Sequence, residues 1–176
     1  AAPKQCTLEK ENPTHIAVVF DTIGPTKRHE IFPAYKGQRD KAPEEIDIAI
    51  PDVDQILDAF NIPVYRLSGF EADDLIGTIA KKADQEGFET YMVTTDKDFA
   101  QLVTDNTYLY RLSTRNDTEE IMGIGQIQEK WDVQRADQVI DILSLWGDTS
   151  DNIPGVTGIG EKTAQKLLAQ FDTVEN

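Results

Sequence analysis

The chain has 176 residues, 39% hydrophobic and 28% charged, the balance of a soluble globular protein with room for one well-buried domain and a small appended module. The formal net charge of −15 argues against a nucleic-acid partner unless local basic patches or bound metal meet the polyanion. The sequence has no apolar run as long as a membrane span and no hydrophobic signal segment. Its single cysteine, Cys6, cannot form an internal disulfide. We therefore expect a cytoplasmic protein with no membrane partner.

The first elements are a buried strand and a basic stretch. Residues 1–12 are polar without a clear pattern, and the apolar run 16–20, which ends in Asp21, predicts a strand buried on both faces. Residues 25–43 then hold five Lys or Arg against two acids. This stretch is either a solvated charged loop or a functional basic patch.

A strand and helix alternation follows. Residues 44–60 predict a helix that Pro51 should kink or restart, with a core face formed by Ile46, Ile50, Val53, Ile56, Leu57 and Phe60. Strands are predicted at 64–67, 90–94 and 107–110, a helix at 71–85, and a polar loop or hairpin at 113–120. The alternation predicts an α/β fold with a largely parallel sheet and flanking helices.

Carboxylates follow three of the predicted strands: first Asp21, then Glu71, Asp73 and Asp74, then Asp96 and Asp98. Acids in a first helical turn are ordinary, because the helix dipole favours them there. Parallel strands end at one edge of a sheet, however, so these acids would converge and repel one another unless a cation lay among them. Oxygen ligands of this kind suit Mg²⁺ or Mn²⁺, and we therefore predict a metal site.

The last third is helical. Helices are predicted at 127–131 and at 136–146, where the apolar face is Val139, Ile140, Ile142, Leu143 and Leu145. A loop with Asp148 and Asp151 leads to the glycine-rich segment 155–160 and a helix at 161–168. The glycines could form a plain linker, but Gly158-Ile159-Gly160 between helices is typical of a helix-hairpin-helix, which grips a phosphate backbone without reading bases.

These motifs together resemble a known family. They are Val18-Val19-Phe20-Asp21, Arg28-His29-Glu30, Tyr35-Lys36 with Arg39, Glu71-Ala72-Asp73-Asp74, Thr95-Asp96-Lys97-Asp98, and the run 147–156 followed by 158–164. In this order they resemble the 5′-nuclease domain of bacterial DNA polymerase I, in the flap endonuclease group, from about Leu8 to the last residue. The resemblance implies an α/β nuclease core at 8–122, with a basic arch at 25–43, and a helical DNA-binding module at 123–176.

The resemblance also implies a function and residue roles. It implies a structure-selective 5′-3′ exonuclease that uses two Mg²⁺ or Mn²⁺ ions to cut flaps, nicked or branched duplex DNA and RNA primers in RNA–DNA hybrids, with a polymerase domain C-terminal in the parent protein. Asp21 and Asp73 would hold the first metal, Glu71, Asp96, Asp98 and Asp151 the second, and Asp74 and Asp148 would act through water or hydrogen bonds. Arg28, Tyr35, Lys36 and Arg39 would steer the scissile phosphate. DNA and a potassium ion would be bound by Gly155, Val156, Gly158, Ile159, Gly160, Lys162, Thr163 and Lys166.

The sequence departs from the family pattern in two places. Lys27 stands where an aromatic residue is usual, and the family's first strand, with its metal-binding Asp, is expected before residue 8 but has no counterpart in residues 1–7. We therefore expect a gap in the core and impaired first-metal binding.

Two other functions are compatible with parts of this sequence. A catalytically disabled fragment that only binds branched or duplex DNA is the main alternative. A haloacid dehalogenase phosphatase is the weaker one, because Phe99 and Ala100 follow the pair Asp96 and Asp98 where that motif expects Thr or Val.

Overall fold

The computed structural model describes residues 10–40, 42–112 and 119–176. The first half contains β1 (Val18–Val19), α2 (Lys27–Ile31), α3 (Glu44–Ala59), β2 (Val64–Tyr65), α4 (Ala72–Gln85), β3 (Thr90–Val93), the 3₁₀ helix η1 (Lys97–Leu102) and β4 (Thr107–Leu112). The second half contains β5 (Glu119–Met122), α5 (Ile124–Trp131), α6 (Gln138–Trp146), β6 (Gly147–Asp148), β7 (Ile153–Pro154) and α7 (Glu161–Phe171). The prediction of an α/β fold with a C-terminal helical module is confirmed.

The described strands form three separate hydrogen-bonded sets. β1 pairs with β2 in parallel, β3 pairs with β4 in parallel and β4 with β5 antiparallel, and β6 pairs antiparallel with β7. Both pairs of core strands that the sequence predicted are parallel. Within the described residues no ladder joins the two parallel pairs, so the expected single sheet is divided.

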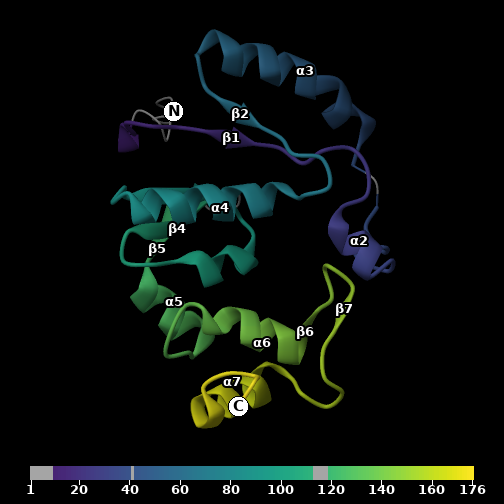
Figure 1. Cartoon of the computed structure of the whole chain (residues 1–176), viewed down its shortest axis with the longest axis vertical. Coiled ribbons are helices and arrows are strands. Elements are labelled where there is room, and N and C mark those ends of the chain that lie inside the picture. The colour runs from purple at the N-terminus through teal and green to yellow at the C-terminus, as the bar shows by residue number, and fades with distance from the viewer. Residues whose placement is uncertain (1–9, 41, 113–118) are drawn as a thin grey trace, which may run out of the picture.

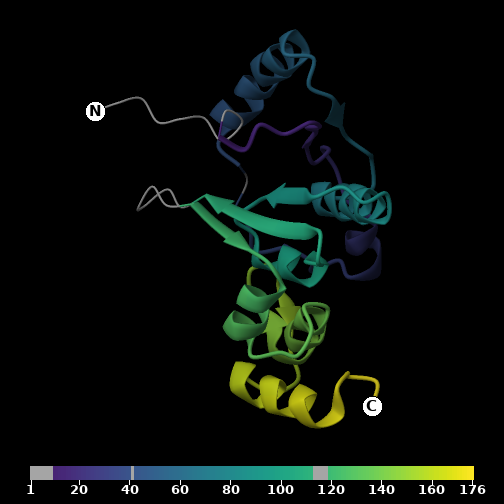
Figure 2. The ribbon, with the colours of Figure 1, turned by 90° about the vertical axis from the view of Figure 1, so that its left-hand side faces the viewer.

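The elements are arranged along the long axis of the molecule. Figure 1 shows α3 and the β1–β2 pair at one end, α4 with the β3–β5 sheet in the middle, and α5, α6 and α7 at the other end. Turned by 90°, Figure 2 shows the β3–β5 sheet beside α4, with the C-terminal helices gathered below it.

The buried core lies between the β3–β5 sheet and the C-terminal helices. Leu109, Met122, Ile127, Val139 and Ile142 are each at most 2% exposed, and they share one hydrophobic cluster with η1 and α7 residues. The buried amide of Gln138 holds the end of this cluster by accepting bonds from Gln134 N and Arg135 N and donating to the carbonyl of Asp172. Because the core joins the sheet to α6, it fixes β6 and its acids relative to η1.

The prediction for the core face of α3 was wrong. The helix runs continuously through Pro51, but it contributes no buried residue, and Ile46, Val53, Ile56 and Phe60 on the predicted face are between 38% and 74% exposed. The physical reason is that α3 has only the two-residue strands β1 and β2 beside it, as Figure 1 shows, and these cannot cover an apolar stripe four turns long. Ile140 of α6, also assigned to the core, is 51% exposed.

Some predictions fall partly or wholly outside the described residues. These are the strand expected before residue 8, Cys6, and most of the loop at 113–120, of which Glu119 and Glu120 open β5. In the basic stretch, α2 replaces part of the expected loop. Within the described parts of the chain no helix is long and apolar enough to cross a membrane.

Candidate metal centre

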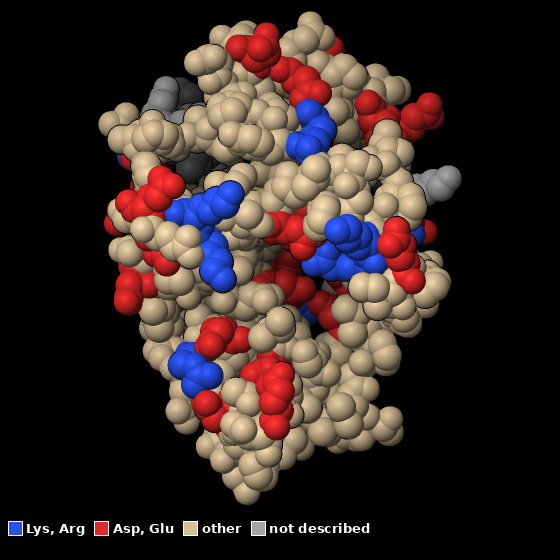
Figure 3. All heavy atoms as spheres, viewed as in Figure 1, with Lys and Arg blue, Asp and Glu red and all other residues tan. Residues whose placement is uncertain are grey.

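Seven acids from four parts of the chain form what we call the acidic cluster: Asp21, Glu71, Asp73, Asp96, Asp98, Asp148 and Asp151. Asp21 follows β1, Glu71 caps α4, Asp96 caps η1 after β3, and Asp148 and Asp151 belong to the β6–β7 hairpin. Figure 3 shows a hollow on this face lined by Asp and Glu, with Lys and Arg at the right-hand rim where Figure 1 places α2.

Backbone hydrogen bonds fix the acids nearest the strand ends. Asp21 Oδ1 accepts from Ala72 N at 2.7 Å, which ties the end of β1 to the start of α4. Asp74 accepts from Glu71 N at 3.0 Å, and Asp96 Oδ1 accepts from Asp98 N at 2.9 Å. These carboxylates therefore accept bonds from some of the free N–H groups at the two helix starts, as is usual at helix N-termini.

Tyr35 links two distant acids of the cluster. Its hydroxyl lies 3.0 Å from Glu71 Oε2 and 2.9 Å from Asp151 Oδ2 and can donate to one of them at a time. Burial, the hydrogen bond to Asp151 and the negative charge of Glu71 raise the pKa of Tyr35. Tyr35 is only 5% exposed, so it positions carboxylates in this conformation and does not face solvent.

The basic residues expected to steer phosphate are paired with acids in this conformation. Lys36 Nζ donates to Glu71 Oε2 at 3.0 Å and lies 3.8 Å from Asp151 Oδ2, and Arg39 pairs with Asp151. Arg28 forms a two-pronged ion pair with Asp74, at 2.7 and 2.8 Å. These cations offset part of the repulsion that the sequence predicted among the acids.

Two carboxyl groups hold their protons unusually strongly. Burial, the charge of Asp96 and then those of Asp21 and Glu71 raise the pKa of Asp73 to about 6, against the opposing charge of Lys36. Burial, then Asp96 and Asp148, raise the pKa of Asp98 to about 6. Asp98 Oδ1 is buried with no hydrogen-bond partner among the described residues, and this is an oxygen that a bound cation would satisfy.

The donor set therefore suits a hard divalent cation, although it is not closed around one point. Among the described residues, no group of three or more His, Cys, Asp or Glu side chains is arranged to hold a metal ion. Lys36, Arg39 and Tyr35 contact the carboxylate oxygens of Glu71 and Asp151 that a metal ion would need as ligands. These side chains must therefore move before a metal ion can bind there.

Residues outside the predicted set complete the surroundings. Lys97 donates to Asp148 Oδ2 at 3.1 Å, Ser150 N donates to Asp148 Oδ1 at 2.8 Å, and the Asn152 amide donates to the Ala34 carbonyl at 2.7 Å. Burial alone would raise the pKa of Asp148, but the bonds from Ser150 and Lys97 outweigh it and lower that pKa. The position of Lys97 between Asp96 and Asp98 was the available signal in the sequence.

The glycine-rich segment and α7 lie apart from the acidic cluster. Gly158 has φ +83°, Gly160 caps α7, and Ala164 and Leu168 anchor the helix in the core. Lys162, Thr163 and Lys166 are exposed, and the two lysines, four residues apart, share one face of the helix. Figure 1 places this helix at the C-terminal end of the molecule.

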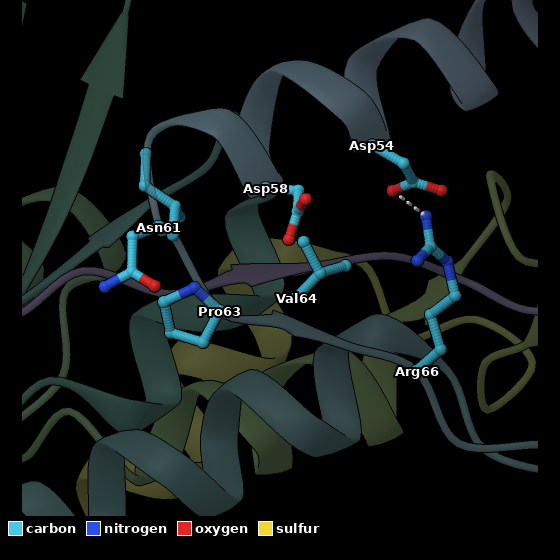
Figure 4. Close-up of a pocket in the computed structure, with 7 residues that line it drawn as sticks. Asp54, Asp58, Asn61, Pro63, Val64 and Arg66 are labelled. Carbon is cyan, nitrogen blue, oxygen red and sulfur yellow. Dashed lines mark hydrogen bonds and ion pairs between the residues drawn. The ribbon is translucent and has the colours of Figure 1, made fainter.

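A pocket of about 570 Å³ lies elsewhere, between α3 and β2 (Figure 4). Its lining includes Asp54 and Arg66, joined by an ion pair at 2.7 Å, together with Asp58 and Asn61. None of the predicted site residues lines it.

The α/β core with carboxylates at its strand ends and the helical module that follows it each match a family model of one class of nuclease. Residues 5–132 match the model described as 5′-3′ exonuclease, N-terminal resolvase-like domain, and residues 134–176 match 5′-3′ exonuclease, C-terminal SAM fold. The chain belongs to the 5′-3′ exonuclease family.

Two proteins of known name are similar in sequence to almost the whole of this chain. The chain is 47% identical over 169 residues to DNA polymerase I of Bacillus subtilis, covering 96% of this chain and 19% of that protein. It is 39% identical over 169 residues to the 5′-3′ exonuclease of Aquifex aeolicus, covering 96% of this chain and 57% of that protein. The chain thus spans about a fifth of the polymerase and just over half of the exonuclease.

Solved structures share the fold. A T5 5′-exonuclease with bound zinc ions is 26% identical, with a TM-score of 0.75, covering 96% of this chain and 64% of that one. A bacteriophage T5 flap endonuclease in a pseudo-enzyme-product complex with DNA and metal ions is 25% identical, with the same TM-score and the same coverage of both chains.

Proposed function

We propose that this chain is the 5′-nuclease part of a bacterial DNA polymerase I or a closely similar exonuclease, and that it hydrolyses phosphodiester bonds near the 5′ ends of flaps, nicks and branched duplexes. The observation that carries the proposal is the convergence of seven carboxylates beside a rim of basic side chains, one of the carboxylates having a buried oxygen with no partner in the described parts of the chain. Membership of the 5′-3′ exonuclease family supports it.

The acids would hold two divalent cations, Mg²⁺ or Mn²⁺, which when bound would activate water and neutralise the leaving oxygen. Asp21 and Asp73 would serve the first ion, and Glu71, Asp96, Asp98 and Asp151 the second. Asp148 and Asp74 would orient ligands or bound water. In this conformation Asp74 pairs with Arg28 and Asp148 pairs with Lys97.

Lys36, Arg39 and Arg28 would exchange partners when substrate binds. Each now pairs with a carboxylate, and a divalent cation on those carboxylates would release the side chains to contact a phosphate. Positive groups held near the scissile phosphate would then stabilise negative charge in the transition state.

The segment from Gly155 to Lys166 would grip the duplex. Its exposed Lys162, Thr163 and Lys166 supply phosphate contacts, and the glycine turn allows the backbone a close approach and could offer carbonyls to a potassium ion.

The remaining parts of the proposal are RNA primers in hybrids as substrates, a polymerase domain following in the same chain, action on DNA in the cytoplasm, and separate units at 8–122 and 123–176.

A DNA-binding module without nuclease activity is the second candidate. The observation that favours it is that, within the described residues, the acids do not close around a metal and the basic side chains block two of them.

Cleavage of a 5′-labelled flap duplex separates the two candidates. The chain would be incubated in Mg²⁺, in Mn²⁺ and in chelator, alongside Asp98→Asn and the matched control Asp105→Asn, an exposed acid at the opposite end of the β3–β4 pair. The nuclease proposal predicts metal-dependent cutting that Asp98→Asn abolishes and Asp105→Asn preserves. Binding without cutting in either metal would instead establish the second candidate.

A further inference from the structure

Lys97 makes one of the contacts that join the acids of the α/β core to those of the hairpin, together with Tyr35 and Lys36. It lies on η1 between Asp96 and Asp98, and its ammonium reaches across to Asp148 Oδ2 at 3.1 Å. The same ammonium lies 5.7 Å from the centre of the Trp146 ring, at the end of α6. One side chain therefore bridges η1 and the α6–β6 junction.

Asp148 depends on this contact because it is buried. The residue is 5% exposed, and its two oxygens are fully committed, Oδ1 to the N–H and hydroxyl of Ser150 and Oδ2 to Lys97. A buried carboxylate that loses its cation is left with an uncompensated charge and tends to move or to take up a proton.

The surrounding acids make the contact more important. Asp98 feels the negative charges of Asp96 and Asp148, and Lys97 is the cation that opposes them. The backbone around Asp148 is also closely packed, since a Cβ added to Gly147 would lie 2.4 Å from Gly155 N. The hairpin thus has little room to carry Asp148 elsewhere while keeping its fold.

We propose that Lys97 is a positioning residue, which fixes Asp148 opposite Asp98 and thereby prepares the acidic cluster to take up a divalent cation. This inference rests on the proposed function, because it assumes that the cluster binds metal. It predicts a change in cation affinity opposite in direction to the change expected from net charge alone. Removing a positive charge should strengthen cation binding by simple electrostatics, whereas removing Lys97 should weaken it.

The test is the affinity for Mn²⁺, followed by the electron paramagnetic resonance signal of the free ion, in the whole chain and its variants. Lys97→Met should weaken binding about tenfold, the effect typical of losing a group that orients metal ligands, and Lys97→Arg should restore it to within about twofold. Lys81→Met, an exposed lysine on α4, is the matched control and should leave affinity unchanged. Melting temperatures without metal would show that each variant is folded.

A double-substitution cycle separates positioning from a general charge effect. If Lys97 acts through Asp148, then Lys97→Met should have little further effect once Asp148→Asn is present, because the shared interaction is already lost. Equal or tighter Mn²⁺ binding by Lys97→Met, or fully additive losses in the double variant, would overturn the inference. Absence of Mn²⁺ binding by the unmodified chain would overturn the proposed metal centre as well, so the two failures are distinguishable.

Discussion

At the scale of single residues, the stability of the folded chain depends on pH through carboxyl groups that are partly buried. Asp98 has a pKa near 6 in the folded chain against 3.8 for a free side chain, so the folded state binds its proton more tightly than the unfolded state. This group therefore favours folding at pH values below about 4, and its contribution is lost as pH rises through about 6.

Asp98→Asn should consequently stabilise the metal-free fold at pH 8 by about 1 to 2 kcal/mol, because a partly buried charge near other acids is removed. Near pH 4 the gain should shrink towards zero, since the carboxyl is then already neutral in the folded chain. Urea denaturation at the two pH values measures both. A gain that is the same at pH 4 and pH 8, or a loss of stability at pH 8, would contradict the raised pKa of this partly buried carboxyl group.

At the scale of elements, the β6–β7 hairpin holds Asp148 and Asp151 through close backbone packing. A Cβ on Gly155 would lie 2.2 Å from the carbonyl oxygen of Trp146, whereas one on Gly158 would meet nothing within 4 Å. Gly155→Ala should therefore cost about 3 kcal/mol of unfolding free energy through overpacking, and Gly158→Ala, at φ +83°, only about 1 kcal/mol from backbone strain. Equal costs in chemical denaturation would show that the hairpin is not closely packed there.

Helix α7 carries the second element-scale prediction. Lys162 and Lys166 are exposed on one face, and if both contact phosphates, replacing either by Met should weaken duplex binding whatever the base sequence. Each replacement should also reduce the slope of log affinity against log salt by about 1. Fluorescence anisotropy with two unrelated duplexes tests this, with Lys81→Met as control. An unchanged salt slope would remove α7 from the DNA interface.

At the scale of the whole molecule, the distribution of charge matters more than its sum. The chain has a net charge of −15, yet part of its acidity is gathered in one hollow with basic side chains at the rim (Figure 3). The basic side chains on this face pair with carboxylates. A divalent metal bound by those carboxylates would release the basic side chains to contact an approaching polyanion. The acidity of the chain is thus compatible with a nucleic-acid substrate when metal is present.

The sequence predicted those features that follow from local patterns. Strands that run in one direction bring the acids at their ends together, and in the structure the charges of Asp96, Asp21 and Glu71 all act on Asp73. Pairings of long side chains have no such periodicity, which is why the ion pairs of Lys36 and Lys97 were not foreseen. The apolar face of α3 was predicted to be buried because sequence periodicity shows which residues share one face of a helix. Periodicity does not show whether another element covers that face, and in the structure the face is exposed.

The most direct measurement is the number of divalent ions that the acidic cluster binds. Mn²⁺ titrated into the chain and followed by electron paramagnetic resonance should reveal two bound ions, of which the ion assigned to Asp21 and Asp73 is the more weakly held. Asp151→Asn should weaken binding of the other, tighter ion, because Asp151 belongs to its proposed ligands. No saturable Mn²⁺ binding, or binding that Asp98→Asn and Asp151→Asn leave unchanged, would contradict the account of this site as the metal centre of a nuclease.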